Sequence, residues 1–214
     1  MSTSRLKIYN EALLILGERA LASLTENLES RHLLDHVWDN DGVKACLEAG
    51  QWKFAMRAVR IDYDPAIAPD FGHNRAFLKP SDWVVTSAVC TDEFFNAPLL
   101  QYVDESGFWY ASIDQIYVRY VSNDANYGGD LSRWTTRFAD FVGAHFASKI
   151  VFKLTGDKER LQLANSIREK RLKEARSIDA MADPTKFPAE GSWNRARRSY
   201  GATRERGNRQ NLIG

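Results

Sequence analysis

Two histidines have the spacing of a helical metal-binding pair. His32 and His36 are four residues apart, so on a helix their side chains face the same way, with Asp35 and Asp39 beside them. The glutamate that follows the first histidine in zinc proteases is absent, because residue 33 is leucine, and no third ligand can be identified. An exposed polar helix face explains these residues better, and we assign no metal.

Other motifs for catalysis or cofactor binding are missing or incomplete. The segment 39–42 (Asp-Asn-Asp-Gly) lacks the alternating acidic positions of a calcium loop. The sequence contains no glycine-rich phosphate loop and no nucleophile elbow, and neither His73 nor His145 stands in a nucleophile signature. Cys46 and Cys90 lack metal-site spacing and indicate buried free thiols. The sequence therefore predicts a protein that is not an enzyme and holds no cofactor.

The richest chemistry lies in the last twenty residues. The segment 195–214 contains six arginines and one glutamate and carries +5, whereas the whole chain carries only +1. Guanidinium groups pair bidentately with carboxylates and phosphates, and two aromatic residues can anchor such a segment in pockets of a partner. The predicted partner-binding residues are Trp193, Arg195, Arg197, Arg198, Tyr200, Arg204, Arg206 and Arg209. Docking on a protein is favoured; binding of nucleic-acid phosphates and a solvated tail without a partner stay open.

Helices are expected in both the N-terminal and the C-terminal third of the chain, and the second of them carries His32 and His36. The first begins after the capping serines and threonine at 2–4 and ends at Gly17, with Tyr9, Leu13 and Leu16 on its inner face. The second runs over about 29–48, where Gly42 weakens it.

Two further helices follow in the C-terminal third. The segment 138–154 is apolar almost all round, which indicates a buried central helix too short and too polar to span a membrane. Gly156 then ends this helix and Asp157 caps the next. The last helix has an inner stripe formed by Leu161, Ala164, Ile167, Ala175 and Ile178.

Between residues 51 and 121 the apolar residues change from helical spacing to the alternation that is typical of strands, and prolines interrupt any helix. Residues 99–103 and 108–113 read as a hairpin across the turn 104–107. Ile116, Val118 and Tyr120 alternate with their neighbours in a third strand. We expect these three strands to form an antiparallel meander.

The fold class predicted from these elements is α+β. It consists of an antiparallel helical bundle, an inserted small antiparallel β-sheet region and an extended C-terminal arm. The expected parts are N-terminal bundle helices (1–50), a β-rich insertion (51–130), a C-terminal helical hairpin (131–182) and a basic arm (183–214).

The order of these elements resembles the tail tubular protein A family of short-tailed bacteriophages. The similarity covers roughly residues 5–182. Its motifs are mostly helix and turn signals, and their order and spacing carry the resemblance. They are Ile8-Tyr9-Asn10-Glu11-Ala12-Leu13 with Leu16-Gly17, Leu24-Thr25-Glu26, Gln51-Trp52, Leu78-Lys79-Pro80 with Asp82-Trp83, Gly156-Asp157, and Ala175-Arg176 to Asp179. The basic segment after residue 182 is less well matched.

The resemblance implies a structural virion protein at the head-to-tail junction, made in the host cytoplasm. Identical subunits would form a ring, with twelve copies expected, between the portal protein and the tail nozzle protein. Double-stranded DNA would pass through the lumen without sequence-specific contacts. The insertion would contact the nozzle through Phe94, Phe95 and Trp109 if they are exposed, although each could equally belong to the core. The alternative function is nucleic-acid binding through the arginine-rich segment.

Overall fold

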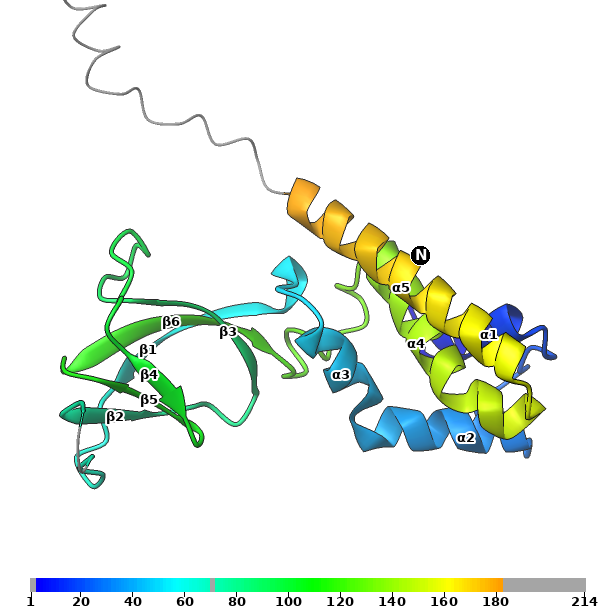
Figure 1. The fold of residues 1–214 in the computed structure, drawn as a ribbon, viewed down its shortest axis with the longest axis horizontal. Coiled ribbons are helices and arrows are strands. Elements are labelled where there is room, and N and C mark those ends of the chain that lie inside the picture. The colour runs from blue at the N-terminus through cyan, green and yellow to red at the C-terminus, as the bar shows by residue number, and fades with distance from the viewer. Residues whose placement is uncertain (1–2, 70–71, 183–214) are drawn as a thin grey trace, which may run out of the picture. The chain divides into compact units, whose positions relative to one another are not determined.

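The computed structural model describes residues 3–69 and 72–182, so the predicted arm at 183–214 lies outside the described residues. The chain is α+β, with helices and two small antiparallel sheets that belong to one unit ending at Met181. In chain order the elements are α1 (Arg5–Leu16), α2 (Glu29–Val37), a π-helical turn (Trp38–Gly42), α3 (Val43–Glu48), a 3-10 turn (Lys53–Ala55), β1 (Met56–Asp62), β2 (Arg75–Leu78), β3 (Trp83–Cys90), β4 (Val103–Glu105), β5 (Phe108–Ala111), β6 (Gln115–Ser122), α4 (Thr136–Thr155) and α5 (Lys158–Met181) (Figure 1).

Helix α1 begins and ends where the sequence predicts. The Ser4 hydroxyl accepts a hydrogen bond from the Lys7 backbone N–H at 3.3 Å. At the other end, Gly17 adopts φ +70°, a left-handed conformation that favours glycine. The expected inner face is buried, and so are Ile8 and Ala12. The caps and the apolar stripe of this helix are therefore confirmed.

The predicted helix over 29–48 is not continuous. A π-helical turn interrupts it, because Asn40 has ψ +58° and Asp41 has φ +60°, outside the helical range. Gly42 follows the break, where an added Cβ would collide with the carbonyl oxygen of Val37. The glycine that was expected only to weaken the helix allows the close approach at a kink that separates α2 from α3.

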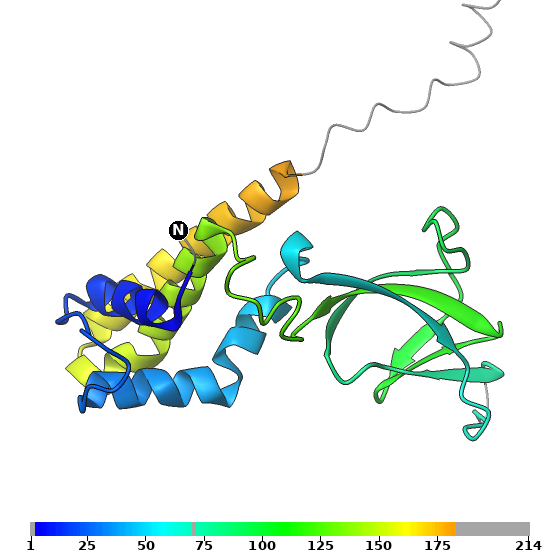
Figure 2. The same cartoon turned by 180° about the vertical axis from the view of Figure 1, so that it is seen from behind.

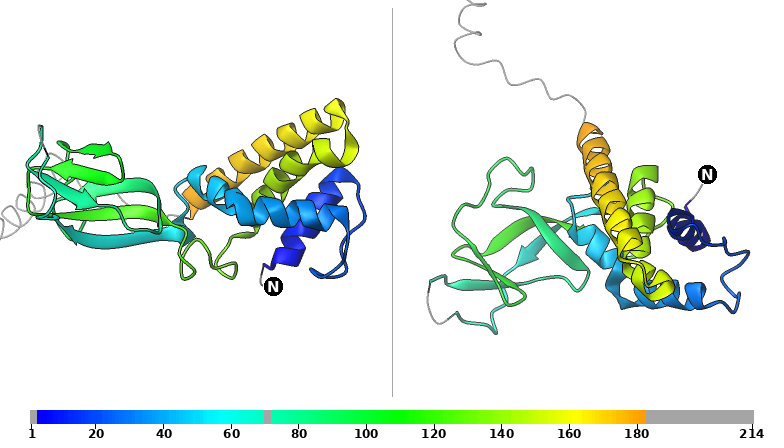
Figure 3. Two further views of the ribbon diagram at one scale, coloured as in Figure 1. Left: turned by 90° about the horizontal axis from the view of Figure 1, so that it is seen from below. Right: turned by 45° about the vertical axis from the view of Figure 1, so that its right-hand side comes forward.

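Helix α4 is buried along most of its length and lies between α5 and the pair α1 and α2 (Figure 3). Gly156 ends it with φ +63°, and the Asp157 carboxylate accepts the backbone N–H of Glu159 at 2.8 Å, which confirms the predicted turn. In α5, Ala164 and Ala175 are buried as expected, whereas Ile178 is 42% exposed.

The exposure of Ile178 has a local cause. The last turn of α5 faces the segment 49–53, where the Asp179 carboxylate accepts a hydrogen bond from the Lys53 backbone N–H at 3.1 Å. Neighbouring residues on a helix point about 100° apart, so Ile178 turns away from this contact. The predicted inner stripe is therefore wrong at its last position.

The six strands in the described part of the chain form two sheets with the orders β1-β6-β3 and β2-β5-β4, all pairs being antiparallel. The sheets face each other across a second core (Figures 1 and 2), whose buried members are Phe77, Val89, Trp109, Ala111, Ile116, Val118 and Tyr120. The predicted hairpin is present as β4 and β5, but β4 overlaps the predicted first strand 99–103 only at Val103, and the turn is shorter than the predicted 104–107. The meander is wrong, because β6 is the central strand of one sheet and β5 of the other.

Candidate protein-binding loop

The chain between β3 and β4 folds back on β3 before it enters β4. Residues 91–100 of this connection, called here the 91–100 loop, are closed at their base by backbone hydrogen bonds. The Thr91 N–H donates to the Ala97 carbonyl at 3.0 Å, and the Leu99 N–H donates to the Val89 carbonyl at 2.9 Å. Cys90 and Pro98 also form an isolated bridge. The loop is thus anchored along the outer edge of β3.

The Asp92 carboxylate fixes the inside of this loop. Its two oxygens accept the backbone N–H groups of Asn96, at 3.0 and 3.1 Å, and of Ala97, at 2.8 Å. The hydrogen bonds from Ala97 and Asn96 lower the pKa of Asp92, because they favour the ionised carboxylate. The charged form is therefore the one that holds the turn closed.

The two phenylalanines at the tip have different surroundings. Phe95 has φ +57°, which is unusual for a non-glycine residue, and its ring lies 4.4 Å from the guanidinium carbon of Arg119 on β6. Such a conformation persists when the surrounding contacts enforce it. Phe94 is 74% exposed. The turn therefore packs one aromatic ring against the sheet and presents the other to solvent.

Further large apolar side chains are exposed after the tip of the loop. Leu99 packs against the second core, whereas the next residue, Leu100, is 86% exposed, and Val103 at the start of β4 is also exposed. Three large apolar side chains thus lie outside within ten residues, the densest such stretch in the described part of the chain. Isolated exposed apolar residues are ordinary, but a concentration on a braced loop is typical of a contact surface.

Trp109 does not belong to this surface. Its side chain is completely buried in the second core, and its indole N–H donates to Asp104 Oδ2 at 3.1 Å and to Thr86 Oγ1 at 3.2 Å. A residue without exposed surface cannot contact a partner protein in this fold. Of the two roles that the sequence left open for Trp109, the structure gives the core role, which removes it from the candidate contact residues.

A buried lysine holds the same hairpin in place. The Lys79 side chain is only 7% exposed, its ammonium lies 3.8 Å from the centre of the Trp83 ring and 5.4 Å from that of Trp109, and it pairs with Asp104. Cation–π contacts are strongest when the cation is desolvated, as here. Lys79 therefore ties β4 to β3. Sequence reasoning noted Lys79 only as part of a family-like motif and assigned it no contact.

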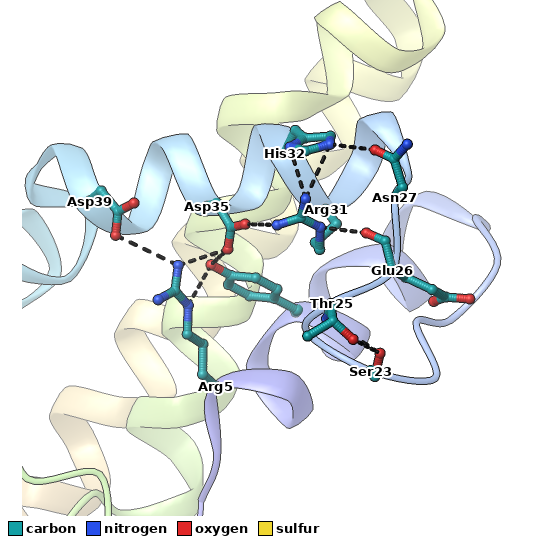
Figure 4. A network of polar contacts seen from close by, with 10 residues as sticks. Arg5, Ser23, Thr25, Glu26, Asn27, Arg31, His32, Asp35 and Asp39 are labelled. Atoms are coloured by element: carbon teal, nitrogen blue, oxygen red, sulfur yellow. Dashed lines mark hydrogen bonds and ion pairs between the residues drawn. The ribbon is translucent and has the colours of Figure 1, made fainter.

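A polar network joins α1 to α2 and contains one of the two histidines considered as metal ligands (Figure 4). Arg5 and the Tyr9 hydroxyl both donate to Asp35, at 2.7 and 2.8 Å, and Arg31 also pairs with Asp35. His32 contacts Asn27 and Arg31, whereas His36 contacts Asn40. Within the described ranges, no three potential ligands gather around a metal position. The network fastens two helices together.

The remaining sites from the sequence have simple outcomes. Cys46 and Cys90 are free and buried, as predicted, and burial raises the pKa of both thiols. The predicted partner-binding residues of the arm lie outside the described residues; they are Trp193, Arg195, Arg197, Arg198, Tyr200, Arg204, Arg206 and Arg209.

No helix in 3–69 or 72–182 is long and apolar enough to cross a bilayer. No family model and no curated protein matches this sequence.

Proposed function

We propose that the chain is a structural subunit of a bacteriophage particle, the head-to-tail adaptor that joins the portal protein to the tail nozzle. The observation that carries the proposal is the 91–100 loop. Its backbone is fixed by Asp92 and by the Phe95–Arg119 contact, and it exposes the large apolar side chains of Phe94 and Leu100. A fixed loop loses little conformational freedom on binding, which favours a stable contact with another protein. The resemblance of residues 5–182 to head-to-tail adaptors supplies the identity of that protein.

Within this proposal each part of the chain has a separate partner. The helices form an antiparallel bundle that packs between neighbouring copies in a ring of twelve. The 91–100 loop contacts the nozzle through Phe94, Leu100 and the partly covered Phe95. Residues 183–214 form an arm whose arginines and two aromatic residues dock on the portal or on a neighbouring copy. Double-stranded DNA passes through the lumen of the ring in the virion.

The nozzle contact is tested with a pair of matched serine variants. Phe94→Ser removes an aromatic ring from the loop, and Leu78→Ser removes an apolar side chain that is 56% exposed on β2. We expect Phe94→Ser to weaken nozzle binding at least about tenfold, as for a central anchor residue worth about 1.4 kcal/mol or more. Leu78→Ser should bind as the unmodified chain does. Equal binding by Phe94→Ser would contradict the assignment of the loop.

The portal contact is tested by truncation. Sedimentation of the full-length protein with portal should give a joint assembly, and a version ending at Asp183 should lose it, because the proposed arm is removed. A full-length protein that stays monomeric and ignores both portal and nozzle would exclude the adaptor function.

The arginine-rich segment supports a second candidate, binding of nucleic acid. Six arginines against one glutamate in 195–214 can neutralise phosphates and release counterions. This function predicts an affinity for DNA that falls steeply with salt, with a slope of about −0.9 in log affinity per log salt for each phosphate contacted. Replacing the arginines with glutamine should abolish it. If the protein does not bind DNA, or binds it with an affinity that does not depend on salt, this second function is excluded and only the adaptor proposal remains.

A further inference from the structure

Arg119 lies on the face of the sheet β1-β6-β3 that points away from the second core. Its neighbours along β6, Val118 and Tyr120, are completely buried in that core, so the side chain between them points to the opposite face. The residues paired with Arg119 are Ala58 on β1 and Ala88 on β3, and each has only a methyl group as its side chain. The long side chain of Arg119 therefore has room to lie along the outer face of the sheet.

The ring of Phe95 lies against the charged end of this side chain. The guanidinium carbon of Arg119 is 4.4 Å from the centre of the ring, which is within the range of a favourable cation–π contact. Arg119 is exposed and forms no ion pair with any residue of 3–69 or 72–182. The contact with Phe95 thus joins the 91–100 loop to the central strand of the sheet.

The backbone of Phe95 needs such a support. Its φ of +57° lies in the left-handed region, where the Cβ of an L-residue crowds the following carbonyl oxygen. This crowding disfavours the left-handed conformation by about 5- to 30-fold. A cation–π contact at an exposed site offsets about two- to fivefold of this factor, and the hydrogen bonds of Asp92 must offset the rest. Without Arg119, the loop therefore spends more time in other conformations.

The direction of Phe94 depends on the conformation of the next residue. With Phe95 held on the sheet, the Phe94 side chain is 74% exposed beside it. Rotation about φ of Phe95 turns the peptide that joins the two residues, so Phe94 then projects in another direction. A partner that accepts Phe94 binds only the molecules in which the loop is held, and its apparent affinity is reduced by that fraction.

We propose that Arg119 is a positioning residue for the nozzle contact. It holds Phe95 on the outer face of the sheet and thereby directs Phe94 into an apolar hollow of the partner. This inference rests on the proposed function of the 91–100 loop. Arg119 acts through Phe95, so its effect on binding requires the Phe94 side chain.

Hydrogen exchange tests the hold of Arg119 on the loop without any partner. Asp92 binds two backbone N–H groups of the loop, and these protons exchange only when the loop opens. Arg119→Gln should speed their exchange about two- to fivefold, the factor that the cation–π contact supplies. Arg60→Gln is the matched control, because Arg60 is an exposed arginine on the same face of the same sheet. Unchanged exchange in Arg119→Gln, or equal acceleration in Arg60→Gln, would overturn the proposal.

A double-mutant cycle with Phe94 tests the effect on nozzle binding. Arg119→Gln should weaken binding about two- to fivefold, whereas Arg119→Lys, which keeps a cation near the ring, should weaken it less. In the Phe94→Ser background Arg119→Gln should have no further effect, because the side chain that Arg119 directs is already gone. Equal binding by Arg119→Gln, an equal loss with Arg119→Lys, or an undiminished loss in the Phe94→Ser background would overturn the positioning role. Circular dichroism shows whether each variant is folded.

Failure of this inference and failure of the proposed function give different results. If the unmodified protein does not bind nozzle, the proposed function fails, and hydrogen exchange still decides whether Arg119 holds the loop. If Phe94→Ser weakens nozzle binding while Arg119→Gln does not, the adaptor function stands and only the positioning role is excluded.

Discussion

His145 is expected to make the stability of the fold depend on pH. The residue lies on α4 and is 9% exposed, and its Nε2 atom has no hydrogen-bond partner among the described residues. The rings of Phe141 and Phe146 are each 6.4 Å from the imidazole. Burial, together with the nearby cations Lys149 and Arg168, lowers the pKa of His145 to about 4. The folded chain therefore holds a neutral imidazole.

The sign and size of the effect follow from the two pKa values. In the unfolded chain the histidine titrates near 6.5, so between pH 6.5 and pH 4 the unfolded state binds a proton that the folded state does not. Stability is complete above pH 6.5 and is lost as the pH falls towards 4. Between pH 7 and pH 5 the loss amounts to about 2 kcal/mol, from a difference of about 2.5 pKa units.

Urea unfolding followed by tryptophan fluorescence at pH 7 and pH 5 measures this loss. The variant His145→Leu cannot take up the proton and should lose about 2 kcal/mol less than the unmodified chain over the same interval. His36→Gln alters an exposed histidine that contacts Asn40 and serves as the control. Parallel stability changes in the His145→Leu variant and the unmodified protein would refute the reasoning.

Four further variants test stability. Asp82→Ala should cost about 2–4 kcal/mol in urea unfolding, because Asp82 accepts hydrogen bonds from Arg57, Tyr120 and Ser122 at the edge of the first sheet. Burial raises the pKa of Asp82 but these bonds outweigh it and leave the pKa low, so Asp82→Asn should lose less stability below about pH 4 than the unmodified chain. Lys79→Met should cost about 1–3 kcal/mol and change the near-ultraviolet circular dichroism of the tryptophans. Phe94→Ser should change stability by less than about 0.5 kcal/mol, and a larger loss would show that Phe94 belongs to the core.

The helical part could be predicted well because its signals are local. Ser4, Gly17, Gly156 and Asp157 end or begin helices through contacts within a few residues, and each does so in the structure. The kink at Asp41 could not be foreseen, since helical periodicity continues on both sides of it. What decides the break is the close approach at Gly42, which depends on packing.

The sheets were harder to predict, because the alternation of apolar and polar residues shows only which residues share a face of a strand. The pattern of Ile116, Val118 and Tyr120 correctly identified a strand, but not that its neighbours would be β1 and β3 instead of β5. Strand pairing between distant segments is set by the common core, which the sequence does not display. The same limit explains Trp109, whose burial requires the second sheet to cover it.

The candidate loop was predicted in part. Phe94 was singled out as an aromatic residue in the insertion, and its exposure agrees with a contact role. Leu100 was assigned to the first strand of the predicted hairpin, yet β4 begins only at Val103. The bracing of the loop by Asp92 and Arg119 depends on contacts that single-residue patterns do not reveal.

The distribution of charge separates the two candidate functions more sharply than net charge does. A segment that binds DNA is opposed by the −7 carried by residues 1–135, because phosphates and carboxylates repel each other. The same carboxylates do not oppose docking of the +5 segment on another protein, because guanidinium groups pair with carboxylates as well as with phosphates. Salt weakens both interactions and cannot distinguish them. A competition measurement can distinguish them, because excess DNA should occupy a segment that binds phosphates but should leave an assembly with portal protein intact.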